Sequence, residues 1–184
     1  MKKEFQEYTA ELNLFSEVFY PEPDRSAIIV GASQIDIELT KLLSKVLKPK
    51  VGKKDELLED DNPLSTFSSK INMAYRLGLI DEDLKRMLNL FKKIRNDMSH
   101  HVLNCSLEDA PHSDRIRDLH TSSSQDPLYL ELLEKFPEKW SHSLNSAKMK
   151  TVIVFLIGRI SALTYHVKTL HEINSKFLVN GAIK

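Results

Sequence analysis

The chain has 184 residues, which is enough for one folded domain with a substantial core. Hydrophobic residues make up 41% and charged residues 28%, as is typical of a globular protein. Lysine and arginine total 26, as do aspartate and glutamate, so the formal net charge is zero and the composition argues against a strongly basic nucleic-acid-binding protein.

Helical periodicity dominates the sequence, and no run of residues alternates as a series of strands would. The first predicted helix covers residues 3–18 and ends before a pair of prolines. Asp24 is suited to cap a long second helix that runs to about Leu47. Residues 48–62 begin basic and turn acidic, and they predict a loop.

The middle of the chain predicts two helices joined by a tight turn. The first begins near Pro63 and ends at Leu77. Gly78 suits the end of this helix, where a left-handed backbone conformation is common. Asp81 can then cap the next predicted helix, which covers residues 82–99.

The last part of the chain mixes a polar segment with a long helix. Residues 103–126 predict a long polar loop that contains a short helix around residues 115–120. A further helix starts at Pro127, and the last one covers about residues 146–177. Together these elements predict a single all-α domain over residues 1–184, folded as a bundle of five or six helices.

The predicted helix at residues 82–99 carries an arginine on its apolar side. On a helical wheel, Arg95 lies roughly 20° from the centre of the apolar stripe. A buried guanidinium needs a partner, because an unpaired buried charge is costly. Asp36 and Glu38 flank the apolar face of the second predicted helix and can supply a carboxylate. The sequence therefore predicts a structural ion pair between Arg95 and Asp36 or Glu38.

The opposite face of the same predicted helix is basic and polar. Its members are Lys85, Asn89, Lys92 and Lys93. Such a face is either a solvated surface or a place where phosphate groups or a partner bind. Histidines near Cys105 do not follow the spacing of a zinc site, so neither a metal nor another cofactor is predicted.

Several blocks of sequence resemble the mannitol operon repressor-like family. These blocks are Asp24–Ala27, Gly31–Asp36, Pro63–Ile71, Leu77–Ile80 and Ile94–His100. The resemblance implies an all-helical transcriptional regulator that has no DNA-binding motif of its own. Such a regulator would be non-enzymatic, would act through a protein partner, and is expected to form a homodimer.

The pair Arg95-Asn96, followed by His100, also resembles the arginine–x4-6–histidine signature of HEPN ribonucleases and their inactive relatives. This second resemblance implies a metal-independent ribonuclease or toxin that acts on RNA at a dimer interface. Arg95, Asn96 and His100 would then be catalytic, with His100 moving a proton and Arg95 stabilising negative charge. On a regular helix Arg95 and His100 point about 140° apart, so a shared site requires a kinked helix end or a second subunit.

The ends of the chain and its apolar runs bear on its location. The N-terminus lacks the apolar run of a signal peptide. The most apolar segment, residues 152–158, is far shorter than the roughly 20 residues that span a bilayer. Because Cys105 is the only cysteine, no internal disulfide can form, and we expect a cytoplasmic protein without a membrane span.

Overall fold

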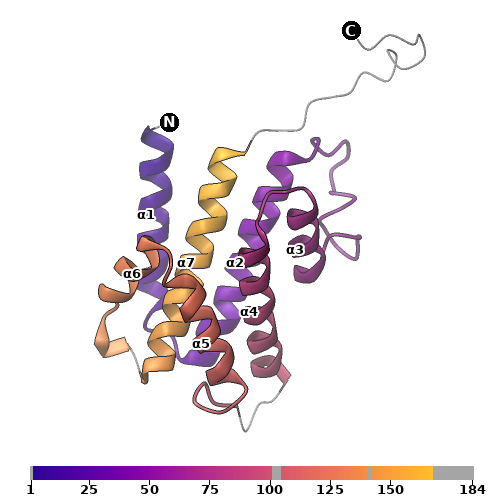
Figure 1. Cartoon of the computed structure of the whole chain (residues 1–184). Helices are drawn as coiled ribbons and strands as arrows, with labels where there is room; N and C mark the ends of the chain where they lie inside the picture. The colour runs from indigo at the N-terminus through magenta and orange to yellow at the C-terminus, as the bar shows by residue number, and fades with distance from the viewer. Residues whose placement is uncertain (1, 101–104, 141, 168–184) are drawn as a thin grey trace, which may run out of the picture.

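The computed structural model describes residues 2–100, 105–140 and 142–167 and is built from helices alone (Figure 1). Within these residues there are seven α-helices, one short 3-10 helix and no strand. The α-helices are α1 (Lys2–Phe19), α2 (Asp24–Val46), α3 (Phe67–Arg76), α4 (Glu82–His100), α5 (His112–Ser123), α6 (Pro127–Glu134) and α7 (Leu144–His166), and η1 (Glu138–Trp140) is the 3-10 helix. The all-α prediction is confirmed, with one helix more than the predicted five or six.

Local side-chain chemistry sets several helix ends where the sequence predicts them. Asp81 accepts a hydrogen bond from the Leu84 backbone N–H at 2.7 Å, and Asp126 accepts one from Leu128 at 3.0 Å. These bonds satisfy N–H groups that have no partner within the helix. Gly78 follows α3 with a φ of +68°, a conformation that glycine adopts without steric cost.

The segment predicted as a long polar loop is partly helical. Helix α5 occupies residues 112–123, a longer stretch than the short helix expected there. It buries Ile116 and Leu119, which lie three residues apart on the face that packs on its neighbours. Two apolar positions in a polar segment are a weak periodic signal, which explains the underestimate. Residues 168–177 of the predicted last helix, like residues 103 and 104 of the predicted loop, lie outside the described residues.

Helix α7 runs through the middle of the bundle, with α1 and α2 beside it and α5 and α6 against another side (Figure 1). Its central residues, 152–157, are buried on every side. A helix that is apolar all round must be surrounded by other elements, and this one forms the centre of the core. No helix in the described part of the chain is both long and apolar enough to cross a membrane.

Gly31 lets α2 approach α7 closely. A Cβ atom at this position would lie 2.5 Å from Cγ2 of Ile153, a branched and fully buried side chain of α7. Such an overlap costs about 1–3 kcal/mol in a packed core. The greater helix propensity of alanine offsets this cost by roughly 1 kcal/mol.

We therefore expect Gly31→Ala to lower the free energy of unfolding by about 1 kcal/mol, measured by urea denaturation. Gly52→Ala is the control, because the nearest atom to a Cβ there is 3.7 Å away. In an Ile153→Ala background the overlap disappears, so Gly31→Ala should become stabilising. Equal effects of Gly31→Ala in both backgrounds would contradict this account of the α2–α7 contact.

Candidate functional site

Arg95 lies outside the buried face of α4, contrary to the sequence prediction. The buried residues of this helix are Leu84, Met87, Leu88, Phe91, Ile94 and Met98. The series Leu84, Phe91 and Met98 repeats every seven residues, so the buried face shifts by about 20° per repeat relative to a straight helical wheel. Over two repeats the shift carries the buried face away from Arg95, which is exposed.

The predicted ion pair between Arg95 and Asp36 or Glu38 is also wrong. Asp36 instead pairs with Lys70 of α3, whose Nζ lies 2.6 Å from its Oδ2. Glu38 lies on the other side of α2, where Lys41 approaches to 2.8 Å. Lys70 is buried, and its place four residues before the buried Ala74 of α3 is a sequence signal for that burial, although not for its partner.

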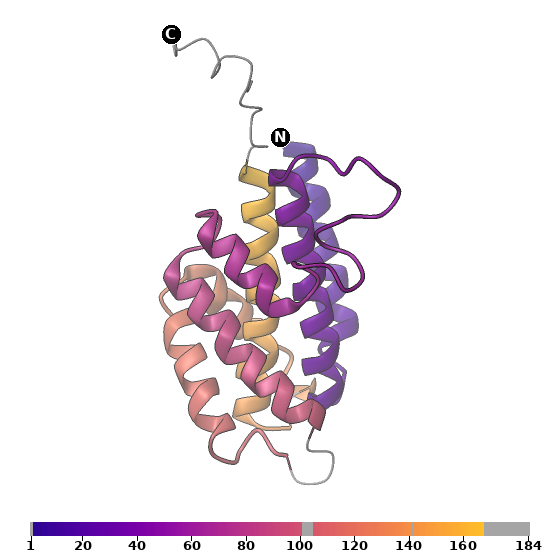
Figure 2. The ribbon, with the colours of Figure 1, turned by 90° about the vertical axis from the view of Figure 1, so that its right-hand side faces the viewer.

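Arg95 lines a groove between α2, α4 and the start of α3. These three helices lie together on one side of the bundle (Figure 2). The groove has a volume of about 630 Å³. Its polar lining includes Asp36, Thr66, Ser68, Lys92, Arg95 and Asn96. We call this feature the α2–α4 groove.

Two cations of the α2–α4 groove are held by neutral groups. Lys92 donates from Nζ to Oγ of Ser68 at 3.0 Å, and Arg95 donates from Nη1 to Oδ1 of Asn96 at 3.0 Å. Within the described residues neither cation has a carboxylate partner. The single carboxylate in the lining, Asp36, is already paired with Lys70, so the groove carries an excess of positive charge.

The predicted basic face of α4 is divided by its contact with α3. Lys85 places its Nζ 3.9 Å from the centre of the Tyr75 ring, a cation–π contact. Asn89 donates to the Lys85 carbonyl at 3.0 Å, within the helix. Lys93 is exposed, so Lys92 is the member of the face that reaches the α2–α4 groove.

His100 is the last residue of α4 and is exposed. The structure brings Arg95 and Asn96 together, but within the described residues His100 makes no polar contact with either of them. One chain therefore does not assemble the three residues of the predicted ribonuclease site. The next histidine of the sequence lies outside the described residues.

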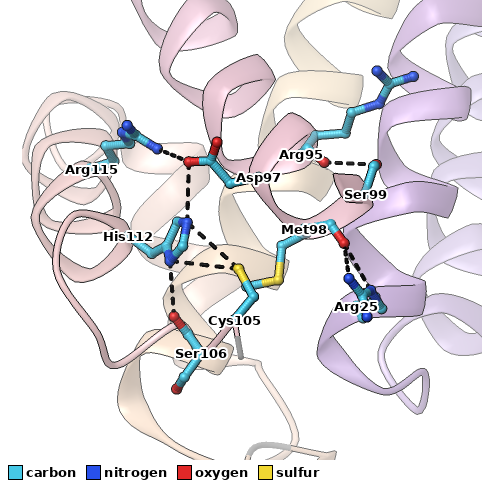
Figure 3. Close-up of polar contacts among 9 residues, drawn as sticks. All are labelled: Arg25, Arg95, Asp97, Met98, Ser99, Cys105, Ser106, His112 and Arg115. Atoms are coloured by element: carbon cyan, nitrogen blue, oxygen red, sulfur yellow. Dashed lines mark hydrogen bonds and ion pairs between the residues drawn. The ribbon is translucent and has the colours of Figure 1, made fainter. Parts of the chain in front are cut away.

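Asp97 joins the end of α4 to α5 (Figure 3). Its Oδ2 accepts from Nη1 of Arg115 at 2.5 Å and lies 3.3 Å from Nε2 of His112. The hydrogen bond from Arg115 is the main cause that lowers the pKa of Asp97, and the His112 contact acts in the same direction. On its other side α4 is held by Arg25 of α2, whose Nε donates to the Met98 carbonyl at 2.8 Å.

The thiol of Cys105 lies against His112 but is not an activated nucleophile. Its Sγ is 3.7 Å from Nε2 and 3.9 Å from Nδ1, so neither ring nitrogen is aimed at it alone (Figure 3). The two nitrogens face other acceptors, the Asp97 carboxylate and the Ser106 carbonyl. Burial, together with the nearby Asp97 charge, raises the pKa of Cys105, which disfavours the reactive thiolate.

In the described part of the chain, no group of three or more His, Cys, Asp or Glu side chains could hold a metal ion.

Comparisons with protein-family models, with curated proteins and with solved structures find no match to the chain. The resemblances drawn from the sequence therefore remain predictions.

Proposed function

We propose that the chain is a non-enzymatic regulatory protein of the cytoplasm that acts by binding a protein partner through an exposed apolar strip of α2. The strip consists of Ile29, Val30 and Ile37, which are 42%, 43% and 47% exposed. Exposed apolar side chains that cluster are typical of protein–protein interfaces, whereas scattered ones are not informative.

The position of the strip on α2 is the observation that carries this proposal. Val30 and Ile37 are seven residues apart and so lie on one face of the helix, two turns from each other. Val30 adjoins Ile29 on the same exposed side. The opposite face of α2 is buried against the rest of the bundle, so these three side chains are not needed for the core.

The resemblance to the mannitol operon repressor-like family supports the same interpretation. Members of that family are expected to regulate transcription through partner proteins, without a DNA-binding motif of their own. A net charge of zero agrees with a protein that does not itself hold DNA. We further propose that the chain is a homodimer, as both family resemblances imply.

The proposal is tested by co-purification with the full chain as bait. The wild type should recover a partner. The amount of partner recovered should fall at least tenfold in the double variant that combines Ile29→Glu and Ile37→Glu. Leu130→Glu is the control, because Leu130 of α6 is 49% exposed but belongs to another surface. A pull-down that recovers only this chain would count against the proposal. Loss of a dimer instead of a partner, seen by light scattering, would assign the strip to a second copy.

One observation favours a second candidate, a HEPN-type ribonuclease. Arg95 forms no buried ion pair within the described residues. Together with Asn96 it lines the α2–α4 groove. A second subunit would have to bring His100 to this arginine. The test is RNA cleavage and growth arrest by the wild type and by His100→Ala. Absence of cleavage by the wild type would eliminate this candidate.

A further inference from the structure

The α2–α4 groove, which Ile37 of the apolar strip also lines, carries a charge balance that suits a ligand of its own. Two cationic side chains line one groove of about 630 Å³, three residues apart on α4. We propose that the groove binds a small phosphate-type oxyanion, held by Lys92 and Arg95.

Both cations keep most of their hydrogen-bond donors for a ligand. An ammonium group has three N–H donors and a guanidinium has five. Within the described residues, Lys92 bonds to one oxygen, that of Ser68, and Arg95 to one oxygen, that of Asn96. These neutral partners position the two side chains without cancelling their charge, which suits the recognition of an anion.

The acidic groups near the groove are paired with cations. Lys70, which is 4% exposed, lies 2.6 Å from Oδ2 of Asp36 and balances the charge of this carboxylate, whose other oxygen, Oδ1, is buried without a hydrogen-bond partner. Asp97 follows on α4 but is bound to Arg115 at 2.5 Å. The net charge facing a ligand therefore comes from Lys92 and Arg95.

The remaining lining indicates what kind of anion fits. Ser33, Ser65 and Thr66 also line the groove. The Ser33 hydroxyl donates to the Ile29 carbonyl at 3.1 Å and the Thr66 hydroxyl to Oγ of Ser69 at 2.9 Å, which leaves their oxygens able to accept a hydrogen bond from a polar group attached to the phosphate. The volume exceeds what an inorganic phosphate needs, so a phosphate monoester of a small polar molecule is accommodated as well. Two cations in one groove favour such a small ligand over nucleic acid, which binds along an extended series of cations.

Isothermal titration of the full chain tests the proposal, with inorganic phosphate and glycerol 2-phosphate as separate probes and chloride at equal ionic strength as the reference. We expect saturable binding of at least one probe. Lys92→Gln and Arg95→Gln should each weaken the Kd at least tenfold, and Lys92→Arg should retain binding. Lys93→Gln is the matched control, because this neighbouring lysine is exposed outside the groove and its loss should change the Kd less than twofold.

Tighter binding of the monoester would show that the hydroxyl lining contributes, whereas equal binding would assign recognition to the phosphate group alone. Either result supports the site. The proposal is overturned if neither probe binds saturably, or if Lys92→Gln and Lys93→Gln have equal effects, which would indicate screening of surface charge. Saturable binding of a single-stranded RNA without binding of either probe would also overturn it. Unfolding midpoints of all variants verify that they are folded.

Discussion

Replacing Lys150 with methionine is expected to lower the free energy of unfolding by about 3 kcal/mol. Lys150 of α7 is 1% exposed, and its Nζ donates to the carbonyl groups of Tyr20 and Trp140 at 3.0 Å each. Asp24 lies 3.8 Å away from the same Nζ. Methionine fills a similar volume but leaves two carbonyl groups without this donor and the Asp24 carboxylate, which keeps its hydrogen bond from Ser146, without its cation. The loss of stability therefore measures the polar contacts and not a cavity.

Urea denaturation followed by circular dichroism measures this loss. Lys93→Met is the control, because Lys93 is an exposed lysine within a helix and its replacement should change stability by less than about 0.5 kcal/mol. Lys150 is costly to bury, and desolvation lowers its pKa while Asp24 opposes that shift. If Lys150→Met were as stable as the wild type, the gain from burying an apolar side chain would outweigh the three contacts of Lys150 with Tyr20, Asp24 and Trp140.

What could be predicted from the sequence was local. Asp81 and Gly78 mark helix ends because a cap needs only residues within one turn of it. Whether Arg95 is buried or exposed could not be predicted from residues within one turn. The direction of the buried face along α4 depends on how α4 crosses its neighbours. A straight helical wheel assumes that this direction is constant, and here that assumption fails within two heptads.

The partners of buried charges were missed for a related reason. The sequence predicts Asp36 as a partner of Arg95, but α3 supplies Lys70 from 34 residues away, and Lys70 pairs with Asp36 instead. Choosing between Lys70 and Arg95 requires the packing of α3 against α2, which no local pattern encodes. Lys150 had a readable signal, since it directly precedes the most apolar stretch of the chain and lies on a helix buried all round.

Asp97, two residues after Arg95, is a site residue that the sequence does not single out. Asp97→Asn is expected to lower the free energy of unfolding by about 2 kcal/mol at pH 7. The charge-assisted bond from Arg115 at 2.5 Å is weakened, and the buried His112 loses the carboxylate that faces its Nε2. Thermal or urea unfolding measures the change. Asp118→Asn is the control, because Asp118 is an exposed carboxylate on α5.

The pH dependence separates a charge effect from a packing effect. Because the folded-state pKa of Asp97 is lowered from the ordinary value of 3.8, its stabilising contribution is fully present above that value and is lost as the pH falls through the lowered one. The stability difference between wild type and Asp97→Asn should therefore shrink below about pH 4. A difference that stayed constant from pH 7 to pH 3 would mean that the amide disturbs packing between α4 and α5. In that case packing, and not the charge of Asp97, would hold the end of α4 in place beside the α2–α4 groove.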